Sequence, residues 1–164
     1  MKPAKTIALA GVLTTLGLAL SYLEALIPLP VGIPGVKLGL ANLVVLIALN
    51  QLGTKTALVV SLLRIALASL LFGTAVSAAY ALSGGLLSFL IMWALLRSGK
   101  FSTAGVSLAG GAAHNLGQLA AAAVVLGTVR VVAYLPALLL CGVTAGALNG
   151  VCAAAVLHRL PQQL

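Results

Sequence analysis

The polar residues that could carry chemistry are few, and they stand inside long apolar segments. Arg64 falls at the middle of one such segment. A charged side chain at the centre of a membrane helix costs about 2.5–3.5 kcal/mol on insertion scales and normally faces a cavity or an opposite charge. Glu24, the single acidic residue, lies near the end of the first apolar segment, within reach of a long guanidinium group. We therefore expect Arg64 to pair with Glu24, to contact a ligand, or to do both.

A second group of polar residues, His114, Asn115 and Gln118, occupies the middle of another apolar segment. His114 and Gln118 share a helix face because they are four residues apart. Polar side chains at such depth need partners, so they either hold helices together or line a ligand cavity. Asn42 and Tyr134, each near the end of its own segment, are further candidates to line the same cavity.

The composition argues against most catalytic chemistry. Magnesium-dependent phosphoryl, prenyl or hydrolytic reactions usually gather several carboxylates around the ion, whereas this chain has one acidic residue. It has neither a Walker A sequence nor a Cys/His set with zinc spacing. Cys141 and Cys152, eleven residues apart in one apolar segment, are expected to be packing residues. We therefore expect no enzymatic activity, no cofactor and no bound metal.

The proportion of apolar residues predicts an integral membrane protein. Of the 164 residues, 62% are hydrophobic and 6% are charged, far from the composition of soluble domains. One membrane span needs about 20 apolar residues, so the length allows about six spans and no separate soluble domain. The sequence predicts an all-α six-helix bundle forming a single membrane domain, with helices at residues 6–27, 38–52, 56–72, 76–96, 103–126 and 131–157.

The distribution of basic residues predicts the orientation of this bundle. Six Lys or Arg residues fall on one side of the predicted bundle and two on the other: Lys2, Lys5, Lys55, Arg97, Lys100 and Arg159 against Lys37 and Arg130. The positive-inside rule then places both termini in the cytoplasm, and the Pro/Gly-rich loop at residues 28–37 outside. The basic residues are scattered singly, so we expect no nucleic-acid partner. The charged start also resembles a secretory signal, but we expect it to be retained as the first span.

Small residues repeat every four positions in several segments. Gly142, Gly146 and Gly150 form one such stripe, and residues 77, 81 and 85 form another. Ala4 and Ala8 begin a third. Small residues let membrane helices approach closely, so we expect these stripes to serve mainly for packing within the bundle. Asn149 is expected to form a contact between helices.

Several longer motifs resemble a known family. These are the runs Leu-Glu-Ala-Leu-Ile-Pro-Leu-Pro, Pro-Gly-Val-Lys-Leu-Gly-Leu-Ala-Asn, Arg-Ile-Ala-Leu-Ala-Ser-Leu-Leu-Phe-Gly and Gly-Gly-Leu-Leu-Ser-Phe. They resemble the Gx transporter family, often labelled heptaprenyl diphosphate synthase component I. That family is similar to the substrate-binding S components of energy-coupling factor (ECF) transporters. The similarity covers nearly the whole chain, from about residue 5 to residue 157.

The resemblance implies a function and a set of partners. S components are six-helix proteins of the prokaryotic plasma membrane that bind a micronutrient from outside and join a scaffold membrane subunit and two ATPases. The loop at residues 28–37 would cover the ligand, and Ala4 and Ala8 would meet the scaffold. The cavity would be lined by Glu24, Asn42, Arg64, His114, Asn115 and Gln118. Lys37, Arg64 and Arg130 would favour an anionic group on an apolar body, such as a vitamin or a precursor of an isoprenoid or quinone.

Other functions are compatible with the same residues. The family label suggests a non-catalytic accessory subunit beside a separate prenyl diphosphate synthase. A structural or quinone-handling subunit of a flavin-linked redox system is compatible with the same composition. A proton-coupled carrier that uses Glu24 or His114 is also possible, although the chain shows no clear inverted repeat. Binding of a small ligand to the isolated protein would separate the importer from the redox subunit.

Overall fold

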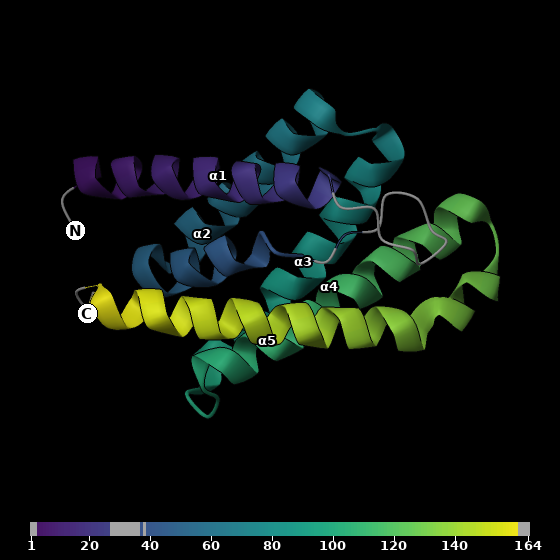
Figure 1. Cartoon of the computed structure of the whole chain (residues 1–164). Helices are drawn as coiled ribbons and strands as arrows, with labels where there is room; N and C mark the ends of the chain where they lie inside the picture. Colours follow the sequence, from purple (N-terminus) through teal and green to yellow (C-terminus); the bar gives the residue numbers. More distant parts are fainter. Residues whose placement is uncertain (1–2, 27–36, 38, 161–164) are drawn as a thin grey trace.

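The computed structural model describes residues 3–26, 37 and 39–160, and this part of the chain is helical without strands. Five α-helices follow one another (Figure 1): α1 (Pro3–Leu26), α2 (Asn42–Phe72), α3 (Ala75–Ser98), α4 (Thr103–Leu126) and α5 (Leu135–Arg159). A 3-10 helix, η1 (Val129–Tyr134), leads directly into α5. The predicted all-α class is confirmed.

Four parts of the described chain are long and apolar enough to cross a membrane: Pro3–Leu26, Asn42–Phe72, Ala75–Ser98 and Val129–Arg159. The chain is therefore a membrane protein. The sequence predicts six spans, whereas four segments of the described chain meet this criterion, so the described residues do not by themselves support the number six. The difference has two reasons. One reason is that α4 falls outside the set, since its central turns carry His114, Asn115 and Gln118. The other is that the segments predicted at 38–52 and 56–72 form the single element α2.

A sharp break at Gly53 divides α2 into two helical halves. Gly53 has φ 77° and ψ 170°, a conformation that L-residues with a side chain rarely adopt. The chain reverses direction there, so that the first half of α2 runs towards the start of α1 and the second half runs away from it (Figure 1). The predicted separation of two segments near Gly53 therefore corresponds to this break. The first half begins only at Asn42, four residues later than predicted.

The turns that join α3 and α4 to their neighbours are fixed by local hydrogen bonds. Thr74 caps α3 through a reciprocal pair of bonds with Ser77, and Ser102 accepts a bond from the N–H of Gly105 at the start of α4. Such caps satisfy the free N–H groups of a first helical turn. The observed bounds of α3 and α4 lie within two residues of the predicted ones.

The helices pack in two groups. Helix α4 packs extensively against both α3 and α5, whereas α1 packs against α2. The start of α1 and the end of α5 lie at the same end of the molecule (Figure 1). Helix α2 also contacts α3 and α5, and it therefore joins the two groups.

The contact between α4 and α5 depends on glycine. A Cβ atom added at Gly142 would lie 2.6 Å from the carbonyl oxygen of Gly111, and one added at Gly146 would lie 2.7 Å from that of Ser107. One added at Gly150 would lie 2.8 Å from the Cα atom of Ala104. The stripe on α5 therefore serves for packing within the chain, as predicted, because a side chain would push the two backbones apart.

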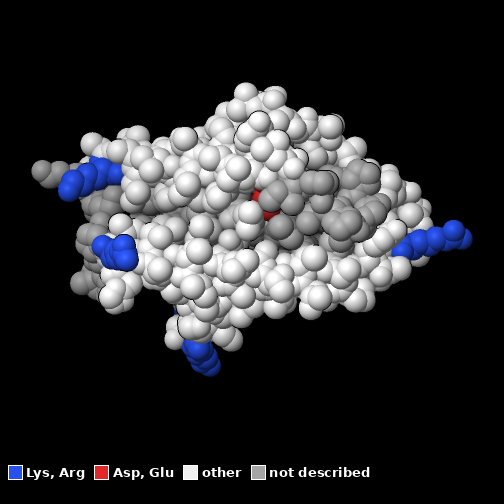
Figure 2. Space-filling view, viewed as in Figure 1, with Lys and Arg blue, Asp and Glu red and all other residues white. Residues whose placement is uncertain are grey.

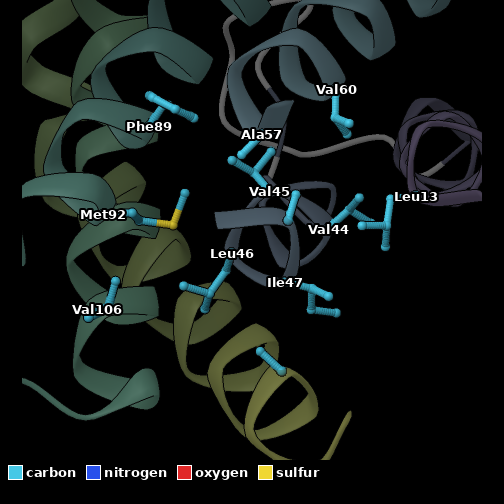
Figure 3. Packing of buried hydrophobic residues seen from close by; sticks show 12 residues of the cluster. Leu13, Val44, Val45, Leu46, Ile47, Ala57, Val60, Phe89, Met92 and Val106 are labelled. Carbon is cyan, nitrogen blue, oxygen red and sulfur yellow. The ribbon is translucent and has the colours of Figure 1, made fainter. Parts of the chain in front are cut away.

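The main apolar core lies around the break of α2. Residues from its two halves meet there, with Val44, Val45 and Leu46 from the first half and Ala57 and Val60 from the second (Figure 3). Leu13 of α1 approaches this cluster from one side, and Phe89, Met92 and Val106 approach it from another (Figure 3). The core thus holds the start of α2 in the interior of the molecule.

Exposed basic side chains stand at the ends of the molecule. Those in the described chain lie near helix ends, in turns or, for Lys55, beside the break of α2: Lys5, Lys55, Arg97, Lys100, Arg130 and Arg159. Blue side chains project from the left and right ends and from the lower edge in Figure 2, and the middle of this face is free of them. A belt without exposed basic side chains is what the interior of a bilayer requires, and the one red patch near the middle of Figure 2 is the buried carboxylate of Glu24.

Candidate ligand site

The site is built around the backbone of Gly39, just before the start of α2. The N–H groups of Gly39 and Leu40 both donate to Oε1 of Glu24, the second at 2.9 Å. The carbonyl oxygen of Gly39 accepts a bond of 3.0 Å from Nδ2 of Asn149 on α5. Gly39 has φ 85°, a conformation that favours glycine. The segment before α2 is thus held by side chains from the first and last helices.

Arg64, in the second half of α2, is buried against α1. Its Nη1 donates to Oγ of Ser21 at 3.1 Å, and 5% of the residue is exposed. A Cβ atom added at Gly17 would lie 2.7 Å from Cδ of Arg64, so this glycine makes room for the side chain. Ser21 and Glu24 are three residues apart and share the buried face of α1.

Glu24 and Arg64 form separate hydrogen bonds in the described structure. Glu24 binds the two backbone N–H groups at the start of α2, whereas Arg64 binds Ser21. The expected direct pair between them is therefore replaced by two separate contacts on neighbouring turns of α1. The Nε and Nη2 atoms of Arg64 are buried and have no hydrogen-bond partner among the described residues.

Gln118 joins the start of α2 to the imidazole ring of His114. Its Oε1 accepts a bond of 3.1 Å from the backbone N–H of Lys37, and its Nε2 lies 2.8 Å from Nε2 of His114. Because the Lys37 N–H can only donate, the amide nitrogen of Gln118 faces the ring, and Nε2 of His114 must accept. The neutral ring then carries its proton on Nδ1, which is buried and makes no hydrogen bond of normal geometry in the described part of the chain, although the backbone of Gly84 lies beside the ring.

Lys37 is half-buried, with its ammonium group 5.8 Å from the centre of the Phe72 ring. The Phe72 ring in turn makes an edge contact with Tyr22 at 5.4 Å between ring centres. Burial lowers the pKa of the Lys37 ammonium from its ordinary value, Glu24 opposes this effect, and Arg64 adds to it. Lys37, Glu24 and Arg64 are therefore close enough to interact electrostatically.

Two asparagines have different positions relative to Gly39. Asn42 is buried beside it, since a Cβ atom added at Gly39 would lie 3.0 Å from Nδ2 of Asn42 and 3.0 Å from Cδ2 of His114. Asn115 points to the contact between α4 and α5, where its Nδ2 donates to the carbonyl oxygen of Leu138. The structure therefore brings Asn42 into the group around Gly39 and gives Asn115 a bond between helices.

Other predicted contributors lie elsewhere. Tyr134 ends η1 and is 39% exposed, and Arg130 of η1 is exposed as well. The structure does not bring either into the group around Gly39. Ala4 and Ala8 are exposed on the first turns of α1. The predicted ligand-covering loop, residues 28–37, lies outside the described residues except for Lys37. The described residues hold no group of three or more His, Cys, Asp or Glu that could bind a metal.

Three residues of the site were not predicted as contributors to it. Ser21 could have been found from its place one turn before Glu24 on the same helix face. Gly39 and Asn149 had weaker signals, since Gly39 was only part of a motif and Asn149 was expected to bind another helix. Their contact joins residues 110 positions apart in the chain, which no local pattern indicates.

Comparison with known families supports the resemblance seen in the motifs. The sequence profile of the heptaprenyl diphosphate synthase component I family matches residues 13–156. The chain belongs to this family. The match to heptaprenyl diphosphate synthase component I includes every residue of the site around Gly39, from Gly17 to Asn149. No curated protein and no solved structure matches the chain significantly.

Proposed function

We propose that this chain is the substrate-binding membrane subunit, or S component, of an ECF-type importer for a small micronutrient. The observation that carries the proposal is a group of buried polar atoms around Gly39 that have no partner among the described residues: Nδ2 of Asn42, Nε and Nη2 of Arg64, and Nδ1 of His114. They come from both halves of α2 and from α4. Each such atom costs free energy when it is buried without a partner. A bound ligand would supply the partners.

The residues that surround these atoms favour a binding site over a simple structural contact. Glu24, Ser21, Asn149 and Gln118 have partners within the chain, and they hold the segment at Gly39 and the ring of His114 in place. The supporting side chains have hydrogen-bond partners within the chain, whereas several central donors have none among the described residues. Such an arrangement is preorganised for a ligand. Pockets for small molecules typically have few polar groups, at fixed positions, in apolar surroundings.

The proposed partners are a scaffold membrane subunit and two ATPase subunits. The outward face of α1 favours such a partner, because its small side chains leave room for another helix. Ala8, Gly11, Thr15 and Ala19 line a hollow of about 650 Å³ on this face together with Val12 and Leu16. A neighbouring helix could approach closely there. Energy for import would come from the ATPases, and the chain itself would not be an enzyme.

We further propose that the protein lies in the plasma membrane of a prokaryote, with both termini in the cytoplasm. In this proposal, six segments lie in the bilayer and complete the six-helix arrangement of S components: α1, the two halves of α2, α3, α4, and η1 together with α5. The polar side chains of α4 support its place in the interior, since His114, Asn115 and Gln118 are buried against other helices.

Native mass spectrometry of the protein purified in mild detergent from its own host tests the proposal. We expect a retained small molecule and co-purifying ATPase subunits. An Arg130→Gln variant, altered at an exposed cation away from the site, serves as a control and should retain the same molecule. Failure to find any retained molecule or any ATPase in repeated preparations would contradict the importer.

The family name favours a second function. A membrane subunit that accompanies a separate prenyl diphosphate synthase, without catalysis of its own, agrees with the name of the family. The same purification distinguishes the two. A prenyl synthase as the sole partner, with no retained small molecule, would support the accessory subunit in place of the importer.

A further inference from the structure

The free polar atoms around Gly39 are all hydrogen-bond donors. The amide nitrogen of Asn42, two nitrogens of Arg64 and the protonated nitrogen of the His114 ring lack partners among the described residues. The other two buried atoms without partners are Oγ of Ser88 and Oδ1 of Asn115. Asn115 belongs to the contact between α4 and α5, and Ser88 lies beside Met92 and Gly110. The donors at Gly39 thus form a distinct group.

The free side of Arg64 has the geometry that recognises an anion. Nη1, which binds Ser21, lies on the side of the guanidinium that faces its own Cδ atom. Nε–H and one Nη2–H point in parallel from the opposite side. This pair of donors matches the two oxygens of a carboxylate or phosphate. Ser21 therefore fixes the guanidinium and leaves the two-donor side unoccupied.

Arg64 and His114 have adjacent glycines of α3 beside them. A Cβ atom added at Gly85 would lie 4.0 Å from Nη2 of Arg64, and one added at Gly84 would lie 3.1 Å from Cε1 of His114. The ring of His114 and the amide of Asn42 both approach Gly39. The three donor side chains thus gather between Gly39 and the middle of α3.

One oxygen of the acidic residue is already occupied by the backbone. Oε1 of Glu24 is occupied by two backbone N–H groups, and one carboxylate stands against the two basic residues Arg64 and Lys37. The site therefore carries an excess of positive charge. The free donors of Arg64 outnumber the acceptors that remain on Glu24, so an anion is favoured over a cation.

We propose that the site binds the anionic, purely hydrogen-bond-accepting head group of an otherwise apolar ligand, a carboxylate or a phosphate, with Arg64, His114 and Asn42 as its donors. This inference rests on the proposed function, and it restricts the substrate class. The Nε–H and Nη2–H groups of Arg64 hold two oxygens of the head group. The Nδ1–H group of His114 and the amide of Asn42 complete its hydrogen bonds.

The test uses four probes with one apolar body and different head groups: geranyl phosphate, geranate, geraniol and geranylamine. Binding to the purified full chain in detergent is measured by calorimetry, with empty micelles as the blank. We expect the two anions to bind about tenfold or more tightly than geraniol, as the loss of a charge-assisted contact implies. Geranylamine should not bind. The tighter of the two anions identifies a carboxylate or a phosphate ligand.

Two variants assign the preference to the named donors. Arg64→Gln should abolish the preference for anions over geraniol, whereas Arg130→Gln, which removes an exposed cation outside the site, should keep it. Asn42→Asp changes one amide to a carboxylate of nearly the same shape and should shift the preference towards geranylamine, provided that the variant keeps its helical circular dichroism. This second variant tests the head group even if Arg64→Gln fails to fold.

The inference is overturned if geraniol or geranylamine binds as tightly as the anions, if none of the four probes binds, or if folded Asn42→Asp keeps the wild-type order. These outcomes are separate from a failure of the importer. A molecule and ATPases retained from the host, combined with no anion preference, would leave the importer standing and remove only the assignment of the head group.

Discussion

Glu24 on α1 and Asn149 on α5 both hydrogen-bond the backbone of Gly39, one through its N–H and the other through its carbonyl oxygen. The first and last helices are thus tied to the segment that begins α2. Because α1 packs mainly on α2 and α5 mainly on α4, this contact also links the two groups of helices. The position of the donor side chains depends on it, since Asn42 and His114 lie beside Gly39.

Replacement of Glu24 by alanine should destabilise the protein. It would leave the backbone N–H groups of Gly39 and Leu40 without their acceptor, and each unsatisfied buried group costs about 1–3 kcal/mol. Glu24→Gln keeps an amide oxygen as an acceptor and should cost less. The unfolding free energy of both variants is measured in mild-detergent micelles by titration with a denaturing detergent, with circular dichroism as the signal. Equal stability of Glu24→Ala and the wild type would show that these bonds do not support the fold.

Gly39→Ala and Gly53→Ala form a matched pair. Both glycines have positive φ, a conformation that costs a residue with a side chain about 1–3 kcal/mol. At Gly53 an added Cβ meets nothing within 4 Å, whereas at Gly39 it would lie 3.0 Å from Asn42 and from His114. We expect Gly39→Ala to be the more destabilising and to weaken ligand binding as well. Thermal unfolding and probe binding compare the two, and equal losses for both would contradict the crowding at Gly39.

Gly142→Ala should be costly because α4 and α5 are in backbone contact. The new Cβ atom would lie 2.6 Å from the carbonyl oxygen of Gly111, and such overpacking typically costs about 1–3 kcal/mol. Gly11→Ala is the control, since an added Cβ meets nothing within 4 Å there and alanine favours the helix by up to about 1 kcal/mol. The unfolding temperature should therefore fall for Gly142→Ala and rise or stay unchanged for Gly11→Ala. A Gly142→Ala variant as stable as the wild type would mean that α4 and α5 can separate without cost.

Lys37 should make stability depend on pH in the alkaline range. Burial lowers the pKa of its ammonium from 10.5, so the folded protein releases this proton at a lower pH than the unfolded chain does. Below the lowered pKa both states hold the proton, and the folded state bears the full cost of burying the charge. As pH rises from the lowered pKa towards 10.5, this cost disappears and stability rises.

The measurement for Lys37 is the difference in unfolding free energy between the wild type and Lys37→Met across this range, because other titrating groups then cancel. We expect the wild type to gain relative to Lys37→Met as pH rises. Lys100→Met, at an exposed lysine, should track the wild type. A difference that stays constant with pH would show that the ammonium of Lys37 is not desolvated.

The membrane class and the helix positions could be predicted because they depend on local composition. Runs of apolar residues give the spans, and capping residues such as Thr74 and Ser102 give the helix ends. The break at Gly53 was also visible, but the way in which the chain continues there was not. A glycine with positive φ can form a sharp turn between two helical segments or belong to a longer loop. The packing of both halves of α2 into one core selects the sharp turn here.

The site was predictable in part for the same reason. Arg64, His114 and Gln118 were visible because a polar side chain in an apolar segment needs a partner. Which partner each one takes depends on contacts between distant parts of the chain. Gln118 binds the backbone of a residue 81 positions away, and Arg64 binds Ser21 rather than the acidic residue one turn later. Backbone acceptors and donors have no signature in the sequence, so the role of Gly39 could not be foreseen.

The proposed orientation gives a last prediction, tested by cysteine labelling. Exposed Lys5, Lys55, Lys100 and Arg159 should face the cytoplasm, and Arg130 should face the outside, because basic residues accumulate on the inner side. In a background with Cys141→Ala and Cys152→Ala, single cysteines at Val129→Cys and Phe101→Cys report on η1 and on the turn between α3 and α4. Both positions are well exposed, at 80% and 52%. A maleimide that cannot cross the membrane should label intact cells at position 129 and not at position 101. Labelling at 101 alone would invert the proposed topology, and equal labelling at both would exclude a single orientation.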